Sequence, residues 1–313
     1  MGKNTVMATN NFKAFATGAG ANVMTQADWE ALPALLSGFS SGKAASAQVN
    51  KALRQASFIA AAVAQYVSTT GNVDVLDDGN LSGFITKFGN AVSGRLINIR
   101  VLRSSGSYTP TAGTKKIKVT AIGGGGGSGG LPATSSTQFS ASGGGAGGSA
   151  AVTLIDVSTL TFPLSYTIGA GGAAGAGSPI TNNGGSGGNT TFGPLTAPGG
   201  GGSTYGALVQ QGSTNITGNS APGAVATGGN ILNMRGSAGG YAFLFGQSSL
   251  VISGSGGNSL LGSGGFGTGF TTPTRALGTG YGSGGSGIAI GPSAAAIDGT
   301  VGTPGVVIVE EYA

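Results

Sequence analysis

The stretch KIKVTAIGGGGGSGG, residues 116–130, joins two kinds of sequence in one run. Residues 116–121 alternate polar and apolar side chains, which predicts a half-buried β-strand. Residues 123–130 are glycine except for one serine. Such a run is either a flexible linker or an extended, polyproline-II-like segment whose backbone hydrogen-bonds to neighbouring segments, since no Cβ keeps the chains apart.

The C-terminal part repeats this junction between strand and glycine run. Of the 66 glycines, 12 lie in residues 1–118 and 54 in residues 119–313. A linker would be one polar block, whereas here apolar segments separate many glycine tracts, which can therefore bond to one another. Packed tracts are the favoured interpretation, and the lack of a strict G-x-y period excludes collagen. The segments that predict strands are 151–157, 165–168, 231–234, 241–245, 250–253 and 306–309.

The N-terminal part is predicted to form helices over residues 25–39, 45–68 and 81–92. In the longest of them, apolar residues recur at alternating steps of four and three. That spacing is typical of a coiled-coil seam, and it also fits an amphipathic helix packed on its own neighbours. The residues concerned are Val49, Leu53, Ala56, Ala60, Val63 and Val67.

The sequence therefore predicts an α+β protein with segregated parts. Residues 1–104 form a helical, coiled-coil region, and the family resemblance given below implies that this coiled coil is trimeric and serves attachment and trimerisation. Residues 105–313 form a β-rich domain with packed polyglycine-II-like segments. The strands at 115–122 and 306–312 carry strong β formers and are expected to pair, with Glu310 opposite Lys116 or Lys118. The excursions 203–222 and 266–281 are then expected at the far end of the domain.

Composition excludes several classes of function. Only 14 basic and 9 acidic residues occur among 313, and there is no His or Cys. Serine and cysteine nucleophile systems that need His, zinc sites and disulfides are therefore ruled out. Glu310 and Glu311 point to opposite faces of a strand, and Asp156 and Asp298 stand alone in sequence, so no catalytic carboxylate pair is evident. We expect no enzymatic activity, no cofactor and no metal.

Neither nucleic acid nor membrane is an expected partner. The net charge of +5 comes from basic residues that are scattered rather than clustered with aromatics. The longest apolar run, 58–67, is far shorter than the ~20 residues that span a bilayer. The first residues lack the continuous apolar stretch of a secretory signal peptide.

Several segments resemble a known family. The run 107–127, SYTPTAGTKKIKVTAIGGGGG, is similar to the entry into the glycine-rich C-terminal domain of tail fibre proteins of tailed bacteriophages and prophages. The terminus 305–313, GVVIVEEYA, resembles the closing strand of that domain, and residues 8–80 resemble tail fibre N-terminal regions. Between 131 and 296 the resemblance covers the glycine pattern and not the inserted segments.

The resemblance implies a homotrimeric protein of the virion tail, made in the cytoplasm of the bacterial host. The N-terminal region would attach to tail or baseplate proteins, and the C-terminal domain would bind a polysaccharide, a pilus or an outer-membrane protein on the host. Related adhesins place variable loops between polyglycine segments at the distal tip. The alternatives are a passive fibre or baseplate component, or a glycine-rich structural or ice-binding protein outside the virion, although an ice-binding face would need Thr or Ala at a fixed period.

Candidate receptor-binding residues lie in the segments that interrupt the glycine pattern. Aromatic rings can stack on sugars, and polar side chains can hydrogen-bond to them. The competing interpretation is that each aromatic fills a small core between glycine layers. The candidates are Phe139, Tyr205, Gln210, Gln211, Asn215, Asn219, Phe266, Phe270, Arg275 and Tyr281.

Overall fold

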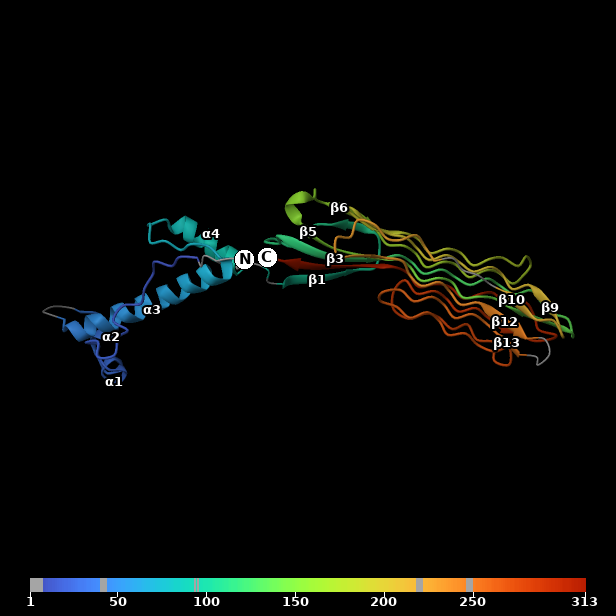
Figure 1. The fold of residues 1–313 in the computed structure, drawn as a ribbon, viewed down its shortest axis with the longest axis horizontal. Helices are drawn as coiled ribbons and strands as arrows, with labels where there is room; N and C mark the ends of the chain where they lie inside the picture. Colours follow the sequence, from blue (N-terminus) through green and yellow to red (C-terminus); the bar gives the residue numbers. More distant parts are fainter. Residues whose placement is uncertain (1–7, 40–43, 93, 95, 218–221, 246–249) are drawn as a thin grey trace, which may run out of the picture. The chain divides into compact units, whose positions relative to one another are not determined.

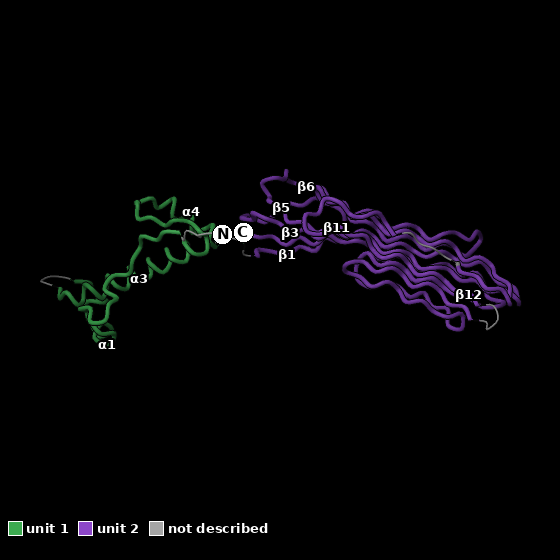
Figure 2. The backbone as a smooth tube through the Cα atoms, in the orientation of Figure 1, with its two compact units in different colours: residues 1–95 green, residues 96–313 purple. Residues whose placement is uncertain are grey.

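A computed structural model describes residues 8–39, 44–92, 94, 96–217, 222–245 and 250–313 of the chain. The chain divides into two compact units, residues 1–95 and 96–313 (Figure 2). Among the described residues, no helix is long and apolar enough to cross a lipid bilayer.

The first unit contains the helices α1 (Gln26–Glu30), α2 (Ala34–Ser37), α3 (Ser46–Gly71) and α4 (Leu81–Ala91). Asn80 caps α4 by accepting a hydrogen bond from the Gly83 N–H, as a residue before the first turn often does. The small core between α3 and α4 consists of Ala64, Val67, Val75 and Ala91, all buried.

The prediction of an α+β protein with a trimeric coiled-coil region is wrong. The described chain is mostly β-structure and extended glycine tracts, and its helices are four, with no long coiled-coil region among them. In α3, the seam residue Val67 is buried against α4 of the same chain, while Val49 and Leu53 are exposed. Steps of three and four residues also arise when a helix packs on neighbours in its own chain. The spacing alone therefore did not distinguish a coiled-coil seam from such an amphipathic helix. The homotrimer stays a prediction.

The second unit is built on a five-stranded sheet (Figure 1). The strand order is β1 (Leu96–Leu102), β15 (Val306–Tyr312), β3 (Lys116–Ile122), β5 (Ala150–Asp156) and β11 (Leu232–Met234). β3 and β15 pair antiparallel over their whole length, which confirms the expected pairing of the two end strands. Glu310 lies opposite Lys118 and accepts a hydrogen bond from its Nζ at 2.9 Å, which confirms the expected cross-strand pair.

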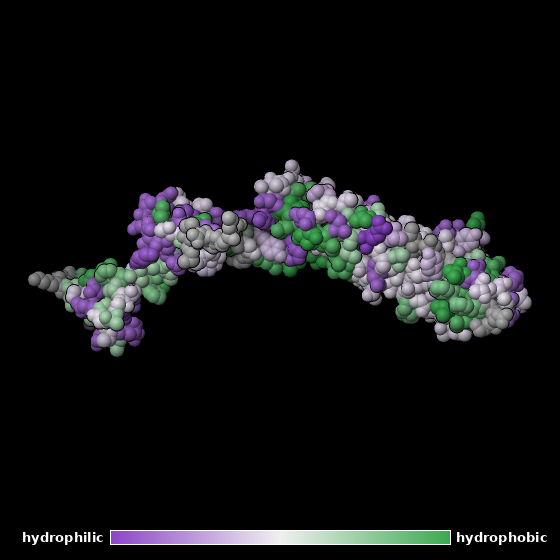
Figure 3. Space-filling model, in the orientation of Figure 1, coloured by the Kyte–Doolittle hydropathy of each residue, from purple (hydrophilic) through white to green (hydrophobic). Residues whose placement is uncertain are grey.

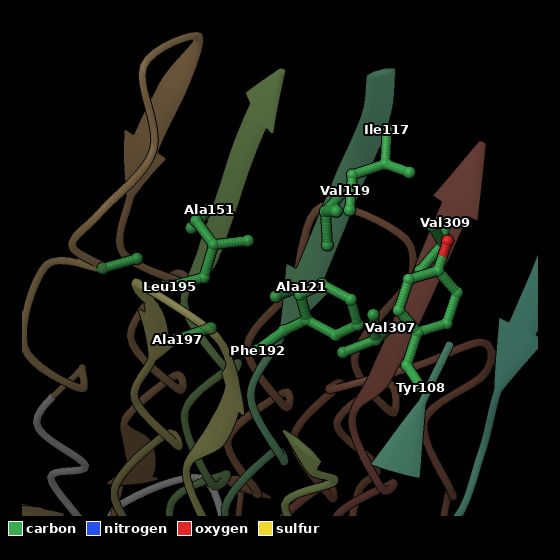
Figure 4. Packing of buried hydrophobic residues seen from close by; sticks show 11 residues of the cluster. Tyr108, Ile117, Val119, Ala121, Ala151, Phe192, Leu195, Ala197, Val307 and Val309 are labelled. Carbon is green, nitrogen blue, oxygen red and sulfur yellow. The ribbon is translucent and has the colours of Figure 1, made fainter. Parts of the chain in front are cut away.

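One face of this sheet forms the main hydrophobic core (Figure 4). Alternate residues of β3 and β15, such as Val119 and Val307, point to it because side chains alternate along a strand. A second sheet covers them and supplies Tyr108, Phe192 and Leu195. That sheet consists of β2 (Gly106–Tyr108), β6 (Leu164–Thr167), β7 (Thr190–Phe192) and β8 (Leu195–Ala197), and the 3-10 turn η1 (Val157–Thr159) follows β5.

Glu311 is buried at the edge of this core and is held by three partners. Its carboxylate accepts hydrogen bonds from the Tyr108 hydroxyl at 2.8 Å and from the Thr111 N–H at 3.4 Å, and it lies 3.1 Å from the Arg100 Nε. Burial acts to raise the pKa of Glu311, but the hydrogen bonds from Thr111 and Tyr108 and the charge of Arg100 outweigh it, so that the pKa lies below its usual value.

We expect the second unit to lose stability in acid. The pKa values of Glu310 and Glu311 are both lowered in the folded chain, the first mainly by the hydrogen bond from Lys118. Their contribution is therefore complete above the unfolded pKa of about 4.3 and falls as the pH drops through the folded values. Thermal unfolding from pH 7 to pH 3 should show a decline below about pH 4.5 that Glu311→Gln makes shallower. A melting temperature that rises towards pH 3 would contradict this.

The glycine tracts are ordered by backbone hydrogen bonds. In the tract 123–130 successive N–H groups donate to three neighbouring tracts in turn and return to the same tract every third residue, which is the repeat of a polyproline II helix. Gly129 is the exception, because its N–H donates to the Ser203 hydroxyl. The donor and acceptor pairs are Gly124 with Gly188, Gly127 with Gly185, Gly130 with Asn182, Gly125 with Thr303, Ser128 with Thr300, Gly123 with Ser149 and Gly126 with Ala146. Carbonyls of the same tract accept bonds from the tract 198–206. These runs are therefore parts of a packed structure and not linkers.

Two small sheets lie at the ends of the tracts, opposite the five-stranded sheet of this unit (Figure 1). One has the order β14 (Ala289–Ile290), β4 (Gln138–Ala141) and β9 (Leu208–Gln210). The other has the order β10 (Asn215–Thr217), β12 (Ala242–Phe245) and β13 (Leu250–Ile252). Both ends of the unit's chain lie in the five-stranded sheet, because β1 begins it and β15 closes it. The segments inserted between them reach the opposite end.

Candidate functional site

The sheet of β10, β12 and β13 presents large apolar side chains to solvent. Between 38% and 61% of each residue is exposed, on one face of the sheet. We call the five residues the apolar sheet face: Ile216, Phe243, Phe245, Leu250 and Ile252. Figure 3 shows hydrophobic residues gathered at the end of the unit that carries these strands.

Strand pairing brings these five side chains together. Phe243 lies opposite Ile216 of β10 on one side and opposite Ile252 of β13 on the other, and Phe245 lies opposite Leu250. Directly paired residues of antiparallel strands point to the same face, with Cβ atoms about 4.5–5.5 Å apart. The five residues therefore form one continuous surface.

The opposite face of the same sheet holds it to the rest of the unit. Ala242, Leu244 and Val251 are buried in a cluster with Phe139, Ala141, Val209 and Ala289 of the neighbouring sheet. Because residues alternate along a strand, burying these three forces the five residues of the apolar sheet face outward. The exposed side chains are thus fixed from behind by a packed core.

The apolar sheet face has no charge and little freedom. Its two phenylalanine rings lie nearly parallel, with centroids 6.2 Å apart and planes inclined by 8°. Arg235 is the only charged residue between positions 205 and 270. A ligand for this face must therefore bind through apolar contact, with a weak dependence on salt.

Five of the candidates predicted from the sequence lie at the same end of the unit. Phe139 is in β4 and buried, with its ring 5.5 Å from that of Phe270 in an edge-on contact, so that both rings belong to the core behind the apolar sheet face. Gln210 ends β9 and accepts a hydrogen bond from the Thr137 hydroxyl at 3.1 Å. Gln211, which follows it, and Asn215 in β10 are also exposed. The polar candidates are thus accessible and the two phenylalanines are largely covered.

The remaining candidates do not form one site. Tyr205 and Phe266 are exposed, and Arg275 lies 3.9 Å from the carboxylate of Asp298. Tyr281 packs on Ile122, Ala150 and Val306 next to the five-stranded sheet, and its hydroxyl accepts a hydrogen bond from Arg103. The expectation that the whole excursion 266–281 lies at the far end is wrong for Tyr281, because the chain returns there to the sheet. Asn219 lies outside the described residues.

Sequence reasoning missed the five residues of the apolar sheet face. In the run AFLF of β12 both odd and even positions are apolar, so alternation does not reveal which set is buried. A signal was nevertheless present, because Phe243 and Phe245 are two aromatic residues on one side of a short strand. Ala242, with its small side chain, faces the core on the other side.

The carboxylates of this unit are engaged in structural contacts. Asp156 accepts hydrogen bonds from the backbone and hydroxyl of Ser158, and Asp298 accepts one from the Gly177 N–H. Glu310 and Glu311 are bound to Lys118 and Tyr108 as described above. In the part of the chain that the structure describes, no cluster of three or more acidic side chains could hold a metal ion.

Comparison with known proteins identifies one family. Residues 102–312, which include both small sheets and the five-stranded sheet except for most of β1, match the family described as a glycine-rich domain. A search of the curated proteins finds no match.

Proposed function

The chain belongs to the glycine-rich domain family, and on that premise we propose that it is a tail fibre adhesin of a tailed bacteriophage. In this proposal residues 1–95 attach the protein to the tail or baseplate, and the apolar sheet face, with the polar side chains beside it, binds a receptor on the bacterial surface. The protein is then part of the virion tail, made in the host cytoplasm, and acts without catalysis.

The exposed apolar sheet face is the observation that carries the proposal. Large contiguous apolar patches are unusual on proteins that act alone, and they mark sites of association. This patch lies at the end of the unit opposite the sheet in which its chain begins and ends. A receptor could reach it there without meeting the attached end of the unit.

Two further observations support an adhesin over its alternatives. A passive fibre component has no need for five exposed apolar side chains that a packed core fixes from behind. An ice-binding face would carry Thr or Ala at a regular period, whereas the apolar sheet face consists of Phe, Ile and Leu. The resemblance of the end segments 107–127 and 305–313 to tail fibre proteins points the same way.

Substituting two residues of the apolar sheet face tests the proposal. The full chain, fluorescently labelled, is screened against a panel of bacteria, and binding to those strains is compared for the wild type and for Phe243→Ser combined with Ile252→Ser. Burying a large apolar side chain contributes about 1.5–3 kcal/mol, so the double variant should bind at least tenfold more weakly, since about 1.4 kcal/mol corresponds to tenfold.

A matched control separates contact from folding. Ile231 is also exposed but lies directly before β11, in the sheet at the other end, so Ile231→Ser should bind as the wild type does. Both proteins should melt cooperatively at similar temperatures. Absence of binding to any strain, or undiminished binding by the double variant, would contradict the proposal.

A further inference from the structure

A groove of about 410 Å³ lies in the N-terminal unit between α3 and the segment 76–84. Its floor is apolar and is formed by Phe12, Ala60, Val63, Ala64 and Phe84. Leu76 and Leu81 stand at its rim with 43% and 70% of their surface exposed. Water in such a groove meets almost only hydrocarbon, which favours a ligand that displaces it.

The unit offers little apolar burial of its own to offset this exposure. Among the residues of this unit that the structure describes, the buried hydrophobic ones are the four small or medium side chains Ala64, Val67, Val75 and Ala91. A core of that size contributes little stability to a helical unit. Occupation of the groove would extend this same core, because Ala64 belongs to both.

One edge of the groove is acidic. Asp77 and Asp78 line it and are exposed, and Asp78 accepts a hydrogen bond from the Asn80 N–H within its own turn. Among the described residues, neither carboxylate has an ion pair with a basic side chain, and the lining of the groove contains no Lys or Arg. Cationic groups placed beside the apolar floor would meet complementary charge.

We propose that this groove binds an amphipathic helix of another protein, with bulky apolar side chains on one face and Lys or Arg beside them. The two carboxylates are exposed outside the apolar floor, so they select a ligand that extends past the floor rather than a small apolar molecule within it. An amphipathic helix has that chemistry at its i, i+3 and i+4 positions. The inference rests on the proposed function, in which this unit attaches to a tail protein.

A second copy of the chain is the competing occupant of the groove. Its helix α1 carries Asp28 and Glu30 and would bring like charge to Asp77 and Asp78, but its α3 carries Lys51 and Arg54 and no acidic residue. The oligomeric state of the chain, with and without Val63→Asp, therefore distinguishes a second copy from a different polypeptide.

Synthetic amphipathic peptides test this chemistry directly. One peptide of leucine and lysine and one of leucine and glutamate, with the same pattern and a fluorescent label, are titrated with the full chain by fluorescence anisotropy. The chain carries Phe243→Ser and Ile252→Ser throughout, which removes the apolar sheet face as a competing site. We expect the lysine peptide to bind at least about tenfold more tightly than the glutamate peptide, and less tightly as salt is raised.

Variants of the groove complete the test. Val63→Asp should abolish binding of the lysine peptide, and Asp77→Asn with Asp78→Asn, at exposed positions, should weaken it several-fold and flatten its salt dependence. Ile85→Ser, at an exposed position of α4 outside the lining, should change nothing. Equal binding of both peptides, full binding by Val63→Asp, or an oligomer that Val63→Asp converts to a monomer would overturn the inference. No bacterial cell is used, so this outcome is independent of the adsorption test.

Discussion

Replacing Gly126 by alanine is expected to prevent the glycine-rich unit from folding. The added Cβ would lie 2.0 Å from the carbonyl oxygen of Gly201 and 2.6 Å from its carbonyl carbon, far inside van der Waals contact. That carbonyl also accepts the N–H of Ala146, whose own carbonyl accepts the N–H of Gly126. Three tracts would have to separate together, so we expect a loss of more than about 4 kcal/mol in the free energy of unfolding.

Gly269 supplies the matched control. A Cβ there would meet only the carbonyl oxygen of Val251, at 3.7 Å, which is an ordinary contact. Gly269→Ala should therefore change the free energy of unfolding by less than about 1 kcal/mol, as measured by denaturant unfolding followed by circular dichroism. A soluble Gly126→Ala protein that unfolds at the wild-type denaturant concentration would show that the tracts are looser than the structure has them.

The strands that close the C-terminal unit could be predicted because their signal is local. Alternating side chains in 116–121 and the run VVIV at 306–309 each indicate a strand without reference to the rest of the chain. The charge of Glu310 then favours a register that places it opposite Lys116 or Lys118, and in the structure it lies opposite Lys118. The local pattern and the cross-strand charge both indicated that these two strands pair.

The arrangement of the glycine tracts could not be predicted in detail. Register in a sheet is normally set by which side chains must be buried, and a tract of glycines has none to distinguish one register from another. The bond from Gly124 to Gly188 could equally well join other pairs on sequence grounds alone. What fixes it is the strand or turn at each end of a tract, such as β3 before residue 123 and β7 after residue 189.

The candidate site could not be predicted either, because its exposed residues depend on how the sheets pack and not on a local sequence pattern. Phe139 and Phe243 are both phenylalanines in short strands, and only the packing of one sheet on another makes the first buried and the second exposed. Tyr281 was misplaced because glycine tracts reverse direction at tight turns. Gly280 and Gly282, on either side of it, both have positive φ values of 70°, which favour glycine.

In the helical part, the apolar spacing identified the helix and left its partner open. The positions 49, 53, 56, 60, 63 and 67 lie on one stripe whether the stripe meets another chain or the same chain. The structure covers the end of that stripe at Val67 with α4. Helix α4 contributes Ala91 and Phe84 to this contact. Two residues are too short a pattern to predict from the sequence that α4 packs on the stripe.

Replacing Val307 by aspartate is expected to unfold the second unit as completely as a blocked glycine tract does. Val307 is fully buried in the main core and is paired with Leu102 of β1 and Ala121 of β3. A carboxylate there would lose its hydration without a hydrogen-bond donor to replace it, which costs several kcal/mol even after relaxation. That loss approaches the whole stability of a typical domain, about 5–15 kcal/mol.

Two companion variants show whether charge in the core is the cause. Val307→Thr keeps the shape and adds one hydroxyl, so it should remain folded and lose about 1–3 kcal/mol. Val101→Asp places the same carboxylate on the exposed face of the sheet, opposite Ile308, and should lose less than about 1 kcal/mol. Denaturant unfolding of all three proteins should rank them with Val307→Asp unfolded in buffer, Val307→Thr intermediate and Val101→Asp close to the wild type. If Val101→Asp were the more damaging of the two aspartates, the buried and exposed faces of this sheet would have to be exchanged.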